Sequence, residues 1–308
     1  MKLKCVVLLL FGFVGCGGQG ALESDAQRLL ASVRDLEEEL VDLSQAIARY
    51  GEISAQFPHT EAEKTARARR VMLGQVQTRL ADREVIPKDS IEAFYESMVE
   101  VAPDYFAALK KLGANYSNQI HLITRFAANT GAVQIKEQAI GIWEKQDRMW
   151  SRYAFRPIPS NRFWQDQLCK DALNITEMLI DKSFREYDRA QSIINKGLSY
   201  ASGEDVISRA KVYAAYCAFW QGNAEDFQQG VALAREALSY EFLSDNNRAR
   251  AYHVIGLCYA YIYQDSEDMV HLDEAIKALN EAVNIDGNMG DAKLLLKELR
   301  QQRGRVAS

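Results

Sequence analysis

The C-terminal half of the sequence contains two segments that match when one is shifted by 39 residues along the chain. Residues 209–213 (RAKVY) correspond to residues 248–252 (RARAY). The match continues at small and aromatic positions: Cys217 with Gly256, Phe219 with Cys258, and Trp220 with Tyr259. Three successive units also end alike, at residues 197–200, 237–240 and 282–285. Self-similarity at about 40 residues in a helical sequence is typical of stacked helix pairs. We therefore expect a helical repeat domain over residues 161–308.

The rest of the composition also favours helices. The 308 residues include only 5 prolines and 18 glycines. An all-β chain needs a turn about every 8–12 residues, which so few turn formers do not supply. Hydrophobic residues make up 48% and charged residues 26%, enough to bury a core. The predicted fold class is all-α: an N-terminal heptad helix or helical hairpin, a helical region, and about three helix pairs with a capping helix.

The last unit resembles a tetratricopeptide repeat (TPR). Its first helix has the aromatic, apolar, small, aromatic pattern at Tyr252, Ile255, Gly256 and Tyr259, and its second has small, bulky, small at Ala275, Leu279 and Ala282. Small residues let two helices approach closely. The segment 264–272 departs from the pattern by about seven extra residues, and Gly287 stands where proline is usual. The resemblance implies three degenerate repeats and a capping helix near 290–303. A generic helical bundle is the alternative.

The resemblance also implies a binding groove on the concave face that the first helices form. Lys211 and Arg250 occupy the same position in adjacent repeats, with His253 and Tyr261 near them in this alignment. Two stacked cations could bind a carboxylate of a protein or peptide partner. The alternative is that both are solvated surface charges. These four residues are the predicted partner-binding residues.

The N-terminal sequence has the features of a signal peptide. Residues 1–15 combine two lysines with a short apolar stretch, too short for the roughly 20 residues that span a bilayer. Phe13-Val14-Gly15-Cys16 resembles a bacterial lipobox, which implies that Cys16 is lipidated and followed by a tether over 16–21. Gly17 after the cysteine implies the outer membrane facing the periplasm. The alternative is an ordinary secretory signal with a chance cysteine.

Residues 22–50 carry apolar side chains at alternating steps of four and three, the heptad pattern of a coiled coil. This pattern allows a homo-oligomer through 22–50. It equally allows a hairpin in one chain with a second helix near 61–82, so that one region covers 22–82. Both alternatives remain open from the sequence.

The region 83–155 predicts helices near 88–101, 103–128 and 131–151. The aromatic residues Trp143 and Trp150 have helical spacing and are expected in the core. Residues 156–160 hold two of the five prolines and predict a linker to the repeat domain. Cys169, Cys217 and Cys258 are expected to be small core residues rather than a disulfide or a nucleophile.

The net charge and the lack of known catalytic motifs narrow the range of functions that the sequence predicts. A net charge of −5 argues against nucleic-acid binding. The sequence has no nucleophile elbow, phosphate-binding loop or HExxH, so we expect no enzyme, cofactor or metal site. The favoured hypothesis is a lipid-anchored protein–protein interaction scaffold in the bacterial cell envelope. Alternatives are an accessory component of a TRAP-type solute-uptake system, as some TPR lipoproteins are, a structural coiled-coil oligomer and, least favoured, a cell-wall enzyme.

Overall fold

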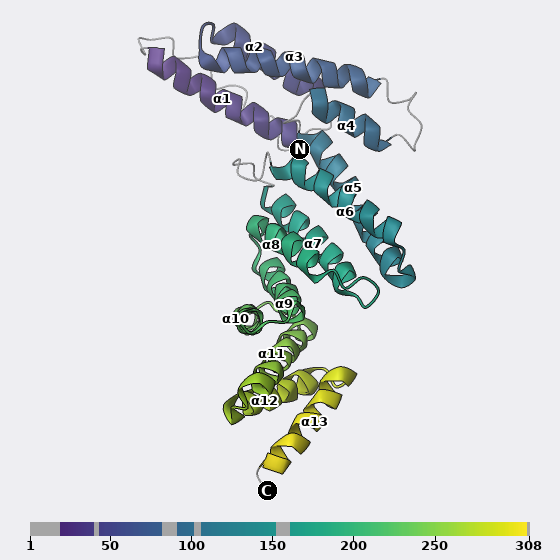
Figure 1. Cartoon of the computed structure of the whole chain (residues 1–308). Coiled ribbons are helices and arrows are strands. Elements are labelled where there is room, and N and C mark those ends of the chain that lie inside the picture. Colours follow the sequence, from purple (N-terminus) through teal and green to yellow (C-terminus); the bar gives the residue numbers. More distant parts are fainter. Residues whose placement is uncertain (1–18, 40–42, 82–90, 102–105, 152–160, 307–308) are drawn as a thin grey trace. The chain divides into compact units, whose positions relative to one another are not determined.

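The computed structural model describes residues 19–39, 43–81, 91–101, 106–151 and 161–306. These residues form thirteen helices and no strand (Figure 1). In chain order they are α1 (Gln19–Glu39), α2 (Leu43–Gln56), α3 (Glu61–Ala81), α4 (Ile91–Val101), α5 (Phe106–Thr130), α6 (Val133–Ser151), α7 (Asn161–Ile180), α8 (Tyr187–Tyr200), α9 (Glu204–Gln221), α10 (Ala224–Leu238), α11 (Asp245–Ser266), α12 (Met269–Ile285) and α13 (Gly290–Val306). The predicted all-α fold class is confirmed.

The chain divides into two compact units, Met1–Asn115 and Tyr116–Ser308, with the division inside α5. The proline-containing linker expected at 156–160 lies outside the described residues, as do the signal segment 1–15 and Cys16. The boundary expected at that linker therefore stays a prediction. None of the described helices combines the length and the apolar composition that crossing a bilayer requires.

In the first unit, α1, α2 and α3 pack on one another. The side chain of Gln77 on α3 donates to Ser44 Oγ on α2 at 2.9 Å, and the backbone N–H of Glu61 donates to Glu23 Oε2 on α1 at 3.1 Å. Two described helices, α1 and α2, fall within the stretch 22–50 and contact each other, and residues 40–42 between them lie outside the described residues. The heptad helix expected over 22–50 stays a prediction.

The apolar pattern of that stretch lets α1 and α2 bury their apolar sides within one chain. Val33 on α1 and Tyr50 on α2 are buried in this way, whereas Leu22 remains 52% exposed. Self-association through 22–50 remains a prediction.

In the second unit, α7 with α8, α9 with α10, and α11 with α12 form consecutive pairs, and α13 packs on α12. Figure 1 shows these helices following one another in the order of the sequence. The apolar contact of α9 and α10 with α11, which we call the apolar junction, is fully or nearly buried and includes Phe219, Phe227, Val254, Ile255 and Cys258.

Local sequence signals set the ends of these helices. Asn223 caps α10 by accepting from the backbone N–H of Asp226 at 3.0 Å, and Asp268 caps α12 by accepting from Val270 at 2.9 Å. Gly222 ends α9 with φ of 86°, a conformation that glycine adopts without strain. The segment 264–272 is not an extended loop, because α11 continues to Ser266 and α12 begins at Met269. Its extra residues lengthen the two helices instead.

Small residues bring the paired helices together. A Cβ added at Gly256 on α11 would lie 2.6 Å from Leu279 Cγ on α12, and one at Gly197 on α8 would lie 2.7 Å from Ala172 Cβ on α7. Both distances are too short for a Cβ unless the neighbouring side chain or its helix shifts. The expected close approach at Gly256 is therefore present in the structure.

The buried cysteines and tryptophans behave as core residues. Cys169, Cys217 and Cys258 are free and fully buried, and burial raises the pKa of each thiol to about 12. Trp143 and Trp150 are each 3% exposed. The core assignments made for these five residues are confirmed.

Helix α6 meets α7 through buried polar side chains. The side-chain amide of Gln146 donates to Asp171 Oδ2 at 2.8 Å, and Ser117 Oγ donates to the same oxygen at 2.5 Å. Gln167 donates to Asp171 Oδ1 at 3.1 Å. Burial raises the pKa of the Asp171 carboxyl to about 6, although these hydrogen bonds favour its charged form.

Ion pairs extend the same contact to α8. Asp147 on α6 accepts from Tyr200 Oη at 3.0 Å and pairs with Lys196. Lys136, whose side chain is 5% exposed, pairs with Glu186 at the start of α8. We call the contacts of Lys136, Gln146 and Asp147 with α7 and α8 the polar junction.

Candidate partner-binding face

Among the first helices of the pairs, α7 packs on α9 and α9 packs on α11. Three residues, one from each helix, meet there. Tyr213 Oη on α9 donates to Glu177 Oε1 on α7 at 2.9 Å. Arg250 on α11 donates to the Tyr213 hydroxyl, and its Nη1 lies 3.6 Å from Glu177 Oε1. A single network therefore links three successive first helices.

A second guanidinium completes this network. Arg209 Nη2 lies 4.0 Å from Glu177 Oε2, and the guanidinium carbons of Arg209 and Arg250 lie 5.9 Å and 5.5 Å from the centre of the Tyr213 ring. We call Glu177, Arg209, Tyr213 and Arg250 the Tyr213 cluster. Two guanidinium groups share one carboxylate, so the cluster carries one surplus positive charge.

The Tyr213 cluster is open to solvent at its charged ends. The side chains of Glu177, Arg209 and Arg250 are 48%, 40% and 35% exposed, whereas Tyr213 is 3% exposed. Burial and the neighbouring Glu177 carboxylate raise the pKa of Tyr213, which keeps the hydroxyl protonated as a donor. The tyrosine thus holds the arginines in place while their outer edges remain accessible.

His253 lies beside this cluster on α11. Its Nδ1 is 2.9 Å from the Tyr216 hydroxyl on α9, and its Nε2 is buried with no hydrogen-bond partner among the described residues. Burial lowers the pKa of His253, although the charge of Asp291 opposes the shift. We infer a neutral imidazole that joins α9 to α11 through Tyr216.

Exposed aromatic side chains lie toward the C-terminal ends of α9 and α11. The Tyr261 ring is 44% exposed and rests 5.3 Å from the rings of both Phe219 and Phe227. Trp220 is 48% exposed and stacks on Tyr187 with ring centres 5.4 Å apart. Such amphipathic rings are enriched in protein interfaces because they bury a large area with few rotatable bonds.

Lys211 occupies a different environment from Arg250. Its Nζ lies 2.6 Å from Glu236 Oε1 on α10, and its side chain is only 16% exposed. Arg250 and His253 on α11 therefore both contact α9. Lys211 instead pairs with a carboxylate on α10, the second helix of its own pair. The two cations that the alignment places at equivalent positions have separate carboxylate partners.

The sequence could identify some residues of this face but not others. Arg209 and Tyr213 belong to the repeated segment 209–213, so the repeat could have identified both. Glu177 has no such signal, because it lies on a helix that aligns poorly with the other repeats. The position of a carboxylate between two arginines depends on the rotation of three helices, which the sequence does not report.

No family model matches the chain, and no curated protein matches it. Within the described residues, no group of three or more His, Cys, Asp or Glu side chains is arranged to hold a metal ion. The structure thus supports consecutive packed helix pairs, an arrangement compatible with helical repeats.

Proposed function

We propose that the chain is an interaction scaffold whose TPR-like helix pairs hold a protein or peptide partner on the face of α7, α9 and α11. The observation that carries this proposal is the Tyr213 cluster, where two half-exposed arginines from adjacent first helices flank one buried tyrosine. A planar guanidinium binds carboxylates through two parallel hydrogen bonds. The surplus positive charge favours an acidic group of the partner at this position.

The neighbouring aromatic residues supply the remaining contact area. Trp220 and Tyr261 are half exposed and each rests on a second ring, so that little conformational freedom is lost when a partner covers them. Interfaces obtain most of their binding energy from a few Trp, Tyr and Arg residues. Lys211 contributes less to this proposal than Arg250 because Glu236 already neutralises its charge.

The proposal includes anchoring to a membrane of the bacterial cell envelope. It rests on the lipobox resemblance of residues 13–16, which would attach acyl chains to Cys16 and hold the helix pairs near a membrane. Replacing Cys16→Ser should release the protein from membranes and abolish incorporation of a fatty-acid probe. Membrane association that is unchanged in this variant would contradict the anchoring part of the proposal.

The binding part is tested by crosslinked pull-down of the full-length protein from its native membranes, with mass spectrometry. We expect one envelope protein to be recovered with wild type and lost with the double change Arg209→Gln and Arg250→Gln. The control is Arg235→Gln, because Arg235 also lies over a tyrosine ring, at 5.6 Å from Tyr259, and near a carboxylate, at 3.6 Å from Glu274.

Two outcomes would contradict the binding part. One is equal loss of the partner in the Arg235→Gln control, which would point to a general effect of removing charge. The other is recovery of self-crosslinks alone, which would favour a structural oligomer. Circular dichroism on each variant verifies that its helical content is retained.

A further inference from the structure

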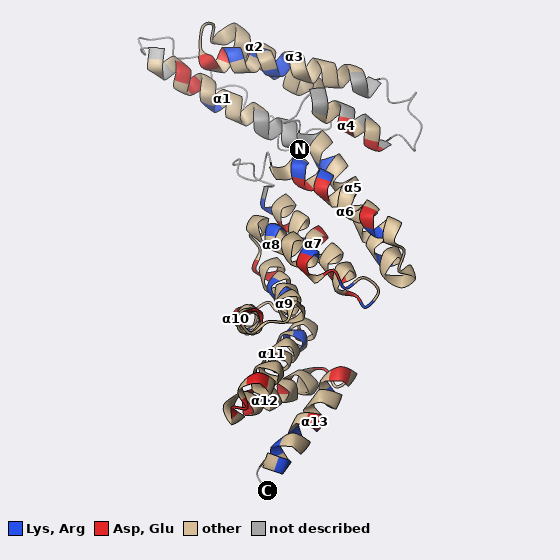
Figure 2. Ribbon diagram, in the orientation of Figure 1, with Lys and Arg blue, Asp and Glu red and all other residues tan. Residues whose placement is uncertain are grey.

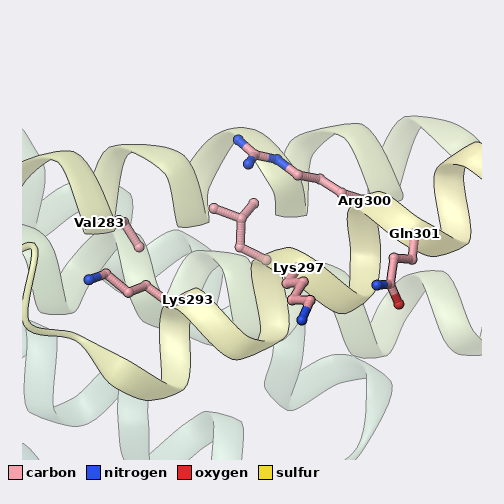
Figure 3. Close-up of a pocket in the computed structure, with 6 residues that line it drawn as sticks. Val283, Lys293, Lys297, Arg300 and Gln301 are labelled. Carbon is pink, nitrogen blue, oxygen red and sulfur yellow. The ribbon is translucent and has the colours of Figure 1, made fainter.

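A basic hollow lies at the end of the helix stack, between α12 and α13. It has a volume of about 450 Å³ and is lined by Val283, Lys293, Leu296, Lys297, Arg300 and Gln301. In Figure 3, Val283 of α12 faces Lys293 of α13, and Arg300 extends toward α12. Arg300 Nη2 donates to Asn280 Oδ1 on α12 at 2.5 Å, which fixes this side of the hollow.

The charge around the hollow is positive although the whole chain has a net charge of −5. Helix α13 carries five basic and two acidic residues, and basic side chains gather toward its C-terminal end (Figure 2). Arg303 is neutralised by Asp273, at 2.9 Å. Lys293 and Lys297 have no carboxylate within ion-pair distance among the described residues, so their charges remain available at the rim.

The bottom of the hollow, between α12 and α13, is apolar. Each of α7, α9 and α11 packs on the helix that follows it, and α12 is the described helix on which α13 packs most extensively. Val283, which is half-buried, and Leu296, which is 6% exposed and packed in the core, supply the apolar part of the lining. A helix laid along this groove would contact α12 and α13 as the described helix pairs contact each other.

We infer that the groove between α12 and α13 docks an acidic amphipathic helix of a partner protein. The apolar face of that helix would pack on Val283 and on the aliphatic stems of Lys293 and Lys297, and its carboxylates would pair with the two ammonium groups. This site lies at the end of the array and uses none of the residues of the Tyr213 cluster. It therefore stands independently of the proposed function.

The chain itself supplies a suitable probe. A synthetic peptide of residues 268–286 reproduces α12, with five acidic residues and one lysine. In the protein this segment already buries an apolar stripe, which includes Leu272, Ile276 and Leu279, against neighbouring helices. The peptide therefore carries the acidic and apolar faces of a helix that packs in this array.

The experiment measures fluorescence anisotropy of the labelled peptide with the full-length protein at low and high salt. Two control peptides accompany it, one with Asp273→Asn, Glu274→Gln and Glu281→Gln, and one with the same composition in scrambled order. We expect the acidic helix to bind about tenfold more tightly than the amide peptide at low salt, since exposed ion pairs contribute modestly and are screened. The scrambled peptide should bind weakly, because it lacks a continuous apolar stripe.

Variants of the protein locate the site. The double change Lys293→Glu and Lys297→Glu should weaken binding of the acidic peptide by about tenfold or more. Lys277→Glu is the matched control, because Lys277 is a 73% exposed lysine on α12 outside the hollow. Arg209→Gln with Arg250→Gln should leave peptide binding unchanged, which separates this site from the Tyr213 cluster.

Several results would overturn the inference. Equal binding of the scrambled peptide would mean attraction by charge alone, and an equal effect of Lys277→Glu would mean that the hollow is not the site. Absence of binding by any peptide would also overturn it. If phosphatidylglycerol vesicles, but not the peptide, bound with dependence on Lys293 and Lys297, the basic surface would be a membrane contact instead of a helix groove.

Discussion

Two junctions in the second unit hold neighbouring helices together by opposite means. The apolar junction joins α9 and α10 to α11 through buried aromatic and aliphatic side chains. The polar junction joins α6 to α7 and α8 through buried hydrogen bonds and ion pairs of Lys136, Gln146 and Asp147. Consecutive helix pairs in one chain therefore need not be held together by one kind of interaction.

The two junctions should respond differently to solution conditions. Burial of apolar area stabilises the folded state almost independently of pH and is strengthened by many salts. Buried ionisable groups gain or lose stability when their protonation differs between the folded and unfolded states. Mutation and pH can therefore be used to separate the contributions of the two junctions.

The largest expected effect is a cavity in the apolar junction. Ile255 is 4% exposed between α9, α10 and α12, so Ile255→Ala should lower the free energy of unfolding by about 2–5 kcal/mol. Urea denaturation followed by circular dichroism measures the change. Leu294→Ala is the control, because Leu294 is 63% exposed, and it should change stability by less than about 0.5 kcal/mol.

The Ile255→Ala effect should also be the same from pH 5 to pH 8, since the described cluster around Ile255 is apolar apart from tyrosines and Cys258, whose thiol has a pKa of about 12. A loss that varied strongly with pH would show that the apolar junction depends on charged groups. The contrast between the two junctions would then be wrong.

The next effect concerns Asp171 in the polar junction. Its pKa is raised from 3.8 to about 6 by burial, against the hydrogen bonds from Ser117, Gln146 and Gln167 and the charge of His121. As pH rises from 3.8 toward about 6, the unfolded chain loses this proton while the folded chain keeps it. The free energy of unfolding should therefore fall across this range, by about 2–3 kcal/mol from this group alone, and stay level above it.

Asp171→Asn tests that sign directly. Asparagine cannot titrate, so the decrease in stability between pH 3.8 and about 6 should be smaller in the variant than in wild type. Chemical denaturation at several pH values gives both curves. An identical slope in wild type and Asp171→Asn would show that Asp171 keeps an ordinary pKa.

The third prediction concerns the close packing of α11 against α12 at Gly256. Gly256→Ala should lower the free energy of unfolding by about 1–3 kcal/mol, because its Cβ would lie 2.6 Å from Leu279 Cγ. Gly304→Ala on α13 is the matched control, since no atom lies within 4 Å of its added Cβ. The control should be neutral or stabilising by up to about 1 kcal/mol through the helix preference of alanine. Equal effects of both changes would mean that the Leu279 side chain or α12 accommodates the added methyl group at no cost.

The helices of the apolar junction could be predicted from the sequence. The matched segments 209–213 and 248–252 predicted two similar helices, which the structure contains as α9 and α11, and the small residue Gly256 indicated a close approach. The heptad stretch 22–50 was harder, because its pattern fits one long helix and two folded ones alike. Apolar periodicity specifies which face is buried and leaves open which helix covers it.

The contacts of the polar junction could not be predicted in the same way. Gln146 and Asp171 are single polar residues within helices, 25 residues apart, and neither belongs to a repeating pattern. The candidate site shows the same limit, since Lys211 and Arg250 are equivalent in the alignment but pair with Glu236 and Glu177 on different helices. A polar contact depends on the rotation of both helices, which a hydrophobic pattern does not determine.

The smallest expected effect lies at the exposed edge of the polar junction. Arg189 forms two hydrogen bonds to Glu137, at 2.8 Å and 2.9 Å, but the two side chains are 38% and 46% exposed. Exposed ion pairs contribute little because water and salt screen them, and Lys136, whose Nζ lies 3.1 Å from Glu137 Oε1, keeps Glu186 as a partner, so Glu137→Gln should lower the free energy of unfolding by about 0.5 kcal/mol in low salt. In 1 M salt the difference from wild type should vanish, whereas the Asp171-dependent slope should persist because Asp171 is buried. If Glu137→Gln instead destabilised the protein as much as Ile255→Ala, the edge pair rather than the buried network would hold α6 in place, and the polar junction would have to be redefined around Arg189.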